Sequence, residues 1–148
     1  MKIRTATLAD VETLQKLEAG AATAAHWSEQ KYREMFFDSG PRRIAIVAED
    51  REQIQGFLVA RVVADAWEIE NVVVAVQLRR QGLGSALLWE CLKRAEEGGA
   101  RAVLLEVRES NEKAKRLYEK AGFQQSGRRA RYYENPQEDA LVYRKESV

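Results

Sequence analysis

Hydrophobic and polar positions along the chain follow two different periods, which together predict an ordered series of strands and helices. Apolar runs rich in β-branched residues predict strands at residues 2–6, 42–49, 54–64, 66–76, 101–107, 123–133 and 140–145. Apolar residues spaced three or four apart predict helices at residues 7–22, 28–37, 84–97 and 111–123. The predicted order of elements is therefore β-α-α-β-β-β-α-β-α-β-β.

The three successive strands in the middle of this order restrict the fold class. A doubly wound sheet requires regular alternation of strands and helices, whereas residues 42–76 form a strand meander. We therefore expect an α/β (α+β) fold, with a mixed central sheet of about six to seven strands and about four helices on both faces. Neither a repeat nor a linker interrupts the pattern, so we expect a single domain over residues 1–148.

The charge balance restricts the partners. The chain has 24 basic and 23 acidic residues, whereas a protein that holds nucleic acid through its phosphates usually carries a basic excess. We expect no direct nucleic-acid partner, and we place the arginine-rich run at residues 128–133 on the exposed face of a late strand. No apolar run is long enough to span a membrane, and the N-terminus lacks a signal-peptide core. The expected location is the cytoplasm, with no membrane partner.

One cysteine and one histidine limit the possible metal and nucleophile chemistry. Cys91 alone cannot form an intramolecular disulfide or a zinc-binding cluster, and the lone His26 weakens a Ser-His-Asp interpretation. We expect no bound metal. Because Cys91 lies on the apolar face of a predicted helix, it is expected to be a core residue and not a nucleophile.

The first candidate site is a glycine turn at the start of the third predicted helix, in "RRQGLGSALL" (residues 79–88). Gly82 and Gly84 permit positive φ and close approach of a ligand, and the first N–H groups of a helix are free to bind an anion. An ordinary turn with solvated arginines is the alternative, and the turn taken alone favours it. The run lacks the Gly-Lys-Ser/Thr of a Walker loop and the third glycine of a dinucleotide-binding turn.

The second candidate is Glu106, a carboxylate inside the apolar strand "VLLEV". A carboxylate in such a strand is either buried at a cost or lies where the strand opens. Partial desolvation would make it a competent general base near neutral pH. The alternative is an ordinary charged residue at the end of a strand, paired with Arg108. The chemistry of the residue alone leaves both possibilities open.

Asn111 and Tyr118 are candidates on the last predicted helix. Asn111 is placed to cap the helix N-terminus. Tyr118 follows seven residues later, so both side chains can lie on the same face. The Tyr118 hydroxyl is either a proton donor or part of a packed aromatic, and spacing alone favours packing.

Together these segments resemble the GNAT superfamily of N-acetyltransferases. "RRQGLGSALL" resembles the acetyl-CoA signature Q/R-x-x-G-x-G/A, with Arg79, Gly82 and Gly84 at the defining positions. "LEVRESNEKAKRLYEKAGF" resembles the second signature, at the usual separation from the first. "HWSE" and the tail "RRARYYENPQEDALVY" narrow the resemblance to the bacterial ribosomal-protein alanine N-acetyltransferase group.

The resemblance implies roles for individual residues. Acetyl-CoA would be the cosubstrate, held where the sheet splays between residues 70–74 and 103–107, and no metal would be needed. Glu106 would be the proton acceptor and Tyr118 the proton donor. The implied cofactor-binding residues are Val72, Val73, Val74, Arg79, Arg80, Gln81, Gly82, Leu83, Gly84, Ser85, Asn111 and Tyr118.

The same resemblance implies the acceptor, which would be the N-terminal amine of a ribosomal protein or similar peptide with alanine first. We expect a monomer or weak dimer. Two alternatives stay open: an acetyltransferase for a small amine, polyamine or lysine side chain, and a non-catalytic acyl-CoA-binding module. The sequence departs from the family at Ala75-Val76, where members often have Asp-Pro.

Overall fold

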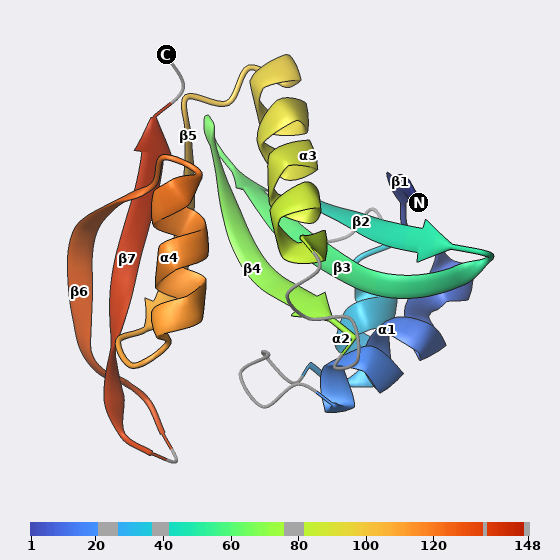
Figure 1. Cartoon of the computed structure of the whole chain (residues 1–148), viewed down its shortest axis with the longest axis horizontal. Coiled ribbons are helices and arrows are strands. Elements are labelled where there is room, and N and C mark those ends of the chain that lie inside the picture. Colours follow the sequence, from blue (N-terminus) through green and yellow to red (C-terminus); the bar gives the residue numbers. More distant parts are fainter. Residues whose placement is uncertain (21–26, 37–41, 76–81, 135, 147–148) are drawn as a thin grey trace.

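The computed structural model describes residues 1–20, 27–36, 42–75, 82–134 and 136–146, and its elements follow the predicted order (Figure 1). The strands are β1 (Lys2–Thr5), β2 (Arg43–Asp50), β3 (Gln53–Val63), β4 (Ala66–Val74), β5 (Ala102–Arg108), β6 (Gln124–Tyr133) and β7 (Glu138–Glu146). The helices are the 3-10 turn η1 (Leu8–Asp10), α1 (Val11–Ala19), α2 (Glu29–Glu34), α3 (Leu83–Glu97) and α4 (Glu112–Lys120).

All seven strands join one mixed sheet in the order β1-β2-β3-β4-β5-β7-β6. Every neighbouring pair is antiparallel except β4 and β5, which are parallel because the chain crosses over through α3 between them. The α/β fold with a mixed central sheet is therefore confirmed. In Figure 1, β1 to β4 form one half of the sheet and β5 to β7 form the other.

Helices cover both faces of the sheet, as expected from the alternation of buried side chains along its strands. Ile46 and Ala48 of β2 belong to the cluster that packs under α3, whereas Ala45 and Val47 pack toward α1 and α2. Side chains of neighbouring strand residues lie on opposite faces, so one strand supplies both clusters. Cys91 of α3 is buried in the first cluster, and burial raises the pKa of its thiol to about 12. Its expected place in the core is confirmed.

Boundaries of three predicted helices differ from the structure, and the last of these helices ends at Lys120 and not at residue 123. The second helix ends at Glu34 and not at residue 37, and Met35 and Phe36 form a turn in which the Phe36 N–H bonds the Arg33 carbonyl. The first helix begins as a 3-10 turn before its α-helical part, which ends at Ala19. Ser28, where the second predicted helix begins, caps that helix: its Oγ accepts the Lys31 N–H at 3.1 Å.

An ion-paired carboxylate, Asp10, fixes the start of this first helix. It accepts the Thr7 N–H at 2.7 Å and two bonds from Arg4, at 2.9 and 3.0 Å. The bonds from Arg4 are the largest cause that lowers the pKa of Asp10 below its ordinary 3.8. Its charge therefore contributes stability above about pH 4, and this contribution is lost as pH falls through the lowered pKa.

We predict that Asp10→Asn destabilises the protein by about 1–3 kcal/mol at pH 7, because charge-assisted hydrogen bonds to Arg4 are lost. Urea unfolding of the variant and wild type should be compared between pH 7 and pH 2. The difference in free energy of unfolding should shrink below about pH 4. A difference that stays constant across this range would show that the charge of Asp10 does not contribute.

Candidate active site

The parallel strands β4 and β5 pair over only part of their length. Their ladder runs from Ala66↔Ala102 to Ile69↔Leu105 and ends there. Beyond that point β4 continues to Val74 and β5 to Arg108, and the two ribbons diverge in Figure 1. The expected splay between residues 70–74 and 103–107 is therefore present.

A β-bulge lies where the two strands part. β3 pairs Ala60 with Ile69 and Val59 with Asn71, so Glu70 is the extra residue on β4. A bulge bends its strand and increases the local twist. The bulge therefore accounts for the turn of β4 away from β5. The segment Val72–Val74 pairs with β3 on one side, while the β5 ladder does not reach its other side.

A buried polar group fixes β4 just past the bulge. The Asn71 amide donates to Glu18 Oε1 at 3.2 Å and to the Tyr32 hydroxyl at 3.3 Å. The same Glu18 oxygen accepts the Trp27 N–H at 2.8 Å. These bonds tie the open part of β4 to α1, to α2 and to the segment before α2. Sequence reasoning did not identify this group.

The glycine turn before α3 has the geometry of an anion site. Gly82 caps the helix with a left-handed φ of 81°, and the first helical bond joins the Ala86 N–H to the Gly82 carbonyl at 3.0 Å. The N–H groups of Leu83, Gly84 and Ser85 therefore have no acceptor within the helix. The other residues predicted for this turn, Arg79, Arg80 and Gln81, lie outside the described residues.

The first turn of α3 lies between the end of β4 and α4. A Cβ added to Gly84 would stand 3.6 Å from Leu117 Cδ2 and 4.0 Å from Val74 Cγ2. The free N–H groups of α3 and the free side of β4 are therefore neighbours. The structure thus brings Val72–Val74 and Gly82–Ser85, two of the segments expected to bind the cofactor, close to each other.

Glu106 lies on β5 beside the splay, with 17% of its side chain exposed. It pairs with Arg129 of β6, at 2.7 Å from Nε to Oε1. The alternative partner considered from sequence, Arg108, instead pairs with Glu138 at 3.2 Å. The negative charge of Glu106, followed by burial, raises the pKa of Tyr132, whose hydroxyl is near the carboxylate.

Tyr118 lies on α4 and is 9% exposed. Its ring packs against Phe123 and Tyr143, with centroids 5.8 and 6.5 Å away. Its hydroxyl forms no hydrogen bond with any residue that the structure describes. Burial, followed by the charge of Tyr133, raises its pKa to about 12, so the hydroxyl carries its proton at neutral pH.

Glu106 and Tyr118 approach the splay from opposite faces of the sheet. Leu105 and Val107 belong to the same buried cluster as Tyr118. Glu106 lies between them in the strand, so its side chain points to the other face. Tyr133 lies close to both groups. Burial, followed by the charge of Glu106, raises the pKa of Tyr133, and the charge of Tyr133 adds to the effect of burial on the pKa of Tyr118.

Asn111 caps α4, and the predicted cap is confirmed. Its Oδ1 accepts the Ala114 N–H at 3.2 Å. The cap fixes the start of the helix that carries Tyr118, two turns later.

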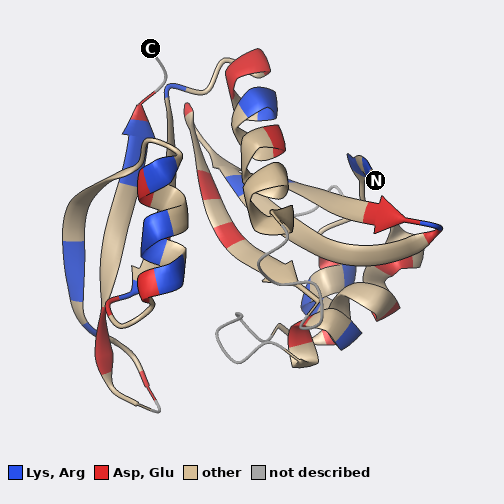
Figure 2. Ribbon diagram, in the orientation of Figure 1, with Lys and Arg blue, Asp and Glu red and all other residues tan. Residues whose placement is uncertain are grey.

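Sequence reasoning missed the contribution of β6 to the environment of Glu106. The exposed face predicted for residues 128–133 is confirmed, but Arg129 crosses the neighbouring strand to reach Glu106. Its partner on β7 is the small, fully buried Ala140, which leaves room for the guanidinium to pass. Figure 2 shows basic segments on β6 and acidic segments on β4.

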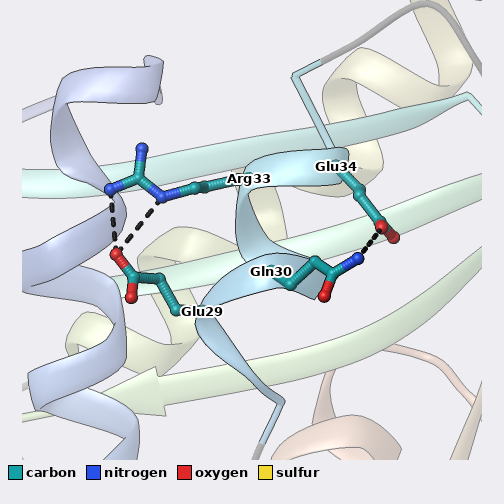
Figure 3. Close-up of a pocket in the computed structure, with 4 residues that line it drawn as sticks. All are labelled: Glu29, Gln30, Arg33 and Glu34. Atoms are coloured by element: carbon teal, nitrogen blue, oxygen red, sulfur yellow. Dashed lines mark hydrogen bonds and ion pairs between the residues drawn. The ribbon is translucent and has the colours of Figure 1, made fainter.

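A separate hollow of about 450 Å³ on α2 offers no comparable chemistry. Its lining side chains bond one another: Arg33 pairs with Glu29 at 2.9 Å, and the Gln30 amide donates to Glu34 at 3.1 Å (Figure 3). Within the described ranges, no group of three or more His, Cys, Asp or Glu residues could hold a metal ion. None of the described helices is both long and apolar enough to cross a membrane.

Comparisons with known proteins show which family this chain resembles. Residues 9–123 match the model of the Acetyltransferase (GNAT) family. The ribosomal protein bS18-alanine N-acetyltransferase of Escherichia coli K12 is 33% identical over 141 residues, which cover 89% of this chain and 95% of the relative. The Haemophilus influenzae protein of the same name is 31% identical over 136 residues, 90% of each chain.

Solved structures show the same fold. The crystal structure of the Escherichia coli ribosomal-protein-S18-alanine N-acetyltransferase has a TM-score of 0.86 and 29% identity, covering 98% of this chain and 92% of that one. Arabidopsis thaliana NAA60 in complex with a bisubstrate analogue has a TM-score of 0.86 at 21% identity, over 98% of this chain and 97% of that one. This chain belongs to the GNAT family of acetyltransferases and is an acyltransferase.

Proposed function

We propose that the chain acetylates the N-terminal α-amine of a ribosomal protein whose first residue is alanine, with acetyl-CoA as donor. The observation that supports the proposal is that Glu106 of β5 and Tyr118 of α4 lie on opposite faces of the sheet, while the β4–β5 ladder ends at Leu105, one residue before Glu106. The similarity to the Escherichia coli enzyme, named for alanine acetylation of ribosomal protein bS18, supports the acceptor.

The groups beside the splay fit acetyl-CoA. The N–H groups of Gly82–Ser85 form a helix N-terminus suited to its pyrophosphate, with Arg79, Arg80 and Gln81 expected beside them. The free side of Val72–Val74 can hydrogen-bond the extended amide arm as an added strand would. Asn111, at the start of α4, would contact the same arm. Bound acetyl-CoA supplies the activated thioester.

Glu106 acts first in the proposed reaction. A peptide α-amine has a pKa of about 7.7–8.0, so much of it is protonated and non-nucleophilic at neutral pH. Glu106 accepts that proton, and the nitrogen lone pair then forms the bond to the acyl carbon. A backbone N–H near Val74 would stabilise the negative charge on the acyl oxygen. The carbon–sulfur bond then breaks with its electron pair on sulfur, and the nitrogen releases its second proton to solvent as the amide forms.

Tyr118 stabilises the departing sulfur in the proposed reaction. A thiol of about pKa 8.5 is more acidic than a phenol whose pKa burial has raised to about 12. Complete proton transfer from Tyr118 is therefore uphill, and its main contribution is a hydrogen bond to the developing thiolate. The proton that completes the thiol comes through this bond or from solvent after release. Cys91 takes no part, because its buried thiol is far from ionised at neutral pH.

The acceptor is tested by acetyl-CoA consumption over a panel of amines. The panel contains hexapeptides that begin with Ala, Ser and Met and share the rest of their sequence, an N-blocked peptide with one lysine, and spermidine. We expect kcat/KM to be greatest for the Ala peptide. Lysine should be a poor acceptor, because its pKa of about 10.4 leaves almost no neutral amine at pH 7.

Two outcomes would contradict the proposal. Greater kcat/KM for spermidine or the lysine peptide would identify a small-amine or side-chain acetyltransferase. Acetyl-CoA binding by calorimetry, without turnover on any member of the panel, would instead indicate an acyl-CoA-binding module. Mass spectrometry of the products distinguishes α-amine from side-chain acetylation.

A further inference from the structure

We propose that Arg129 is a positioning residue that occupies Glu106 in the acceptor-free protein, and that the acceptor's ammonium group displaces it. The inference rests on the proposed function, since it assigns the cation that Glu106 receives. Acceptor binding is then an exchange of one cation for another on the same carboxylate.

The ion pair has the geometry of an exchangeable contact. Arg129 Nε lies 2.7 Å from Glu106 Oε1, yet the Arg129 side chain is 60% exposed while that of Glu106 is 17% exposed. The guanidinium is therefore already largely hydrated, and moving it fully into water costs little free energy. Because the guanidinium is well exposed, we take the pair at the upper end of the range for exposed ion pairs, about a fivefold equilibrium preference, so the contact holds the carboxylate without locking it.

The backbone near Arg129 remains fixed when the side chain leaves. Arg129 pairs with Ala140 at the last regular position before the β6–β7 ladder is interrupted. Two residues later Arg131 has a left-handed φ of 53°, and its N–H donates to Asp139 at 2.9 Å. Release of the guanidinium therefore needs only side-chain rotation, with the ring of Tyr132 beside it at 5.5 Å.

The surrounding charges leave Glu106 as the site of exchange. Two other carboxylates affect the pKa of Tyr132 or Tyr133, and each has its own arginine partner. Glu138 pairs with Arg108 at 3.2 Å, and Glu68 pairs with Arg61 at 3.0 Å. Two cations at one half-buried carboxylate repel each other, so the ammonium and the guanidinium compete. An acceptor binds only the fraction of molecules in which Arg129 has moved away, and its apparent affinity is reduced by that fraction.

The neighbouring Arg128 provides a matched control. It lies on the opposite face of the same strand and pairs with Glu109 and Asp139, at 2.9 and 2.7 Å. Its side chain is also exposed, at 45%. Arg128→Gln thus removes an exposed, ion-paired arginine from β6 without changing the charge at Glu106.

The test compares wild type, Arg129→Gln, Arg129→Lys and Arg128→Gln with the best acceptor of the panel. In Arg129→Gln we expect the acceptor KM to fall about two- to fivefold and kcat/KM to rise by the same factor, while the KM for acetyl-CoA stays constant. Arg129→Lys should restore the wild-type KM, because an ammonium again occupies the carboxylate. Arg128→Gln should match wild type.

Calorimetric titration of the acceptor peptide into the CoA-bound proteins measures the same contrast without turnover. Tighter binding to Arg129→Gln by about two- to fivefold would support the exchange. An unchanged or larger KM and Kd for Arg129→Gln would overturn it, and the proposed function would still stand if wild type acetylates the peptide. A wild type that acetylates no amine would refute the proposed function, and the calorimetric contrast would still decide the exchange.

Discussion

Glu106→Gln is expected to lower kcat by about 10²–10⁴-fold at pH 7, the range typical for loss of a general base. The amide is nearly isosteric with the carboxylate but cannot accept the proton of the acceptor ammonium. The deficit should narrow as pH rises past about 8, because an increasing share of the α-amine is then already neutral. Steady-state rates of wild type and variant from pH 6 to pH 9.5 measure it.

Glu109→Gln is the matched control for this change. Glu109 lies three residues further along, with 47% of its side chain exposed, and pairs with Arg128 at 2.9 Å. It should keep wild-type turnover. The affinity for acetyl-CoA should stay within about twofold of wild type in both variants, because neither side chain lies on α3 or on the free side of β4. Wild-type turnover by Glu106→Gln throughout this pH range would remove Glu106 from the proposed mechanism.

The predictable part of the fold is the part that depends on local pattern. Strand and helix periods predicted every described element in its order. Local hydrogen bonds explain why the helix predicted from residue 28 begins at its Ser28 cap and why Asn111 caps its helix as predicted. The end of α2 was missed because its apolar spacing continues past the last helical residue, Glu34. Spacing shows which side chains pack against the core, but the turn at Met35 and Phe36 buries Met35 and partly buries Phe36 without a helix.

The candidate site shows the corresponding limit for contacts between distant strands. Glu106 was a candidate from its place in an apolar strand and Tyr118 from its spacing on a helix, and the resemblance of the second signature then implied a role for each. The partner of Glu106 could not be found in this way, because Arg129 comes from a strand that is not adjacent to β5 in the sheet. Only the order β5-β7-β6, together with the small Ala140 between them, brings the two charges together.

The bulge at Glu70 and the buried group around Asn71 were equally invisible to pattern analysis. "IENVVV" continues as an apolar strand with no glycine or proline to indicate an extra residue. The bulge follows from pairing with β3, and Asn71 acquires its partners only when α1 and α2 pack on that face. Both features depend on tertiary packing, and both determine where the free side of β4 lies.

Tyr118→Phe is expected to lower kcat by about 10- to 10²-fold, because a hydrogen bond to a developing charge is worth about 1.5–3 kcal/mol. The loss should be smaller than that of Glu106→Gln, since a thiolate can leave without being protonated. Stability should change little, because the hydroxyl has no hydrogen-bond partner among the described residues. Rapid-quench measurement of a single turnover separates this step from product release.

Tyr143→Phe supplies the control, since its ring lies 6.5 Å from that of Tyr118 and is also buried. The substitution removes a neighbouring phenol hydroxyl and should leave kcat within about twofold of wild type, because the Tyr143 hydroxyl makes no hydrogen bond to the leaving sulfur in the proposed mechanism.

Because burial raises the pKa of Tyr118 to about 12, the donor is lost only as pH rises through that value. Wild-type kcat should therefore show no decline due to Tyr118 below about pH 11. Full kcat in Tyr118→Phe would show that the thiolate leaves without a hydrogen bond from Tyr118, and it would contradict the role proposed for this residue.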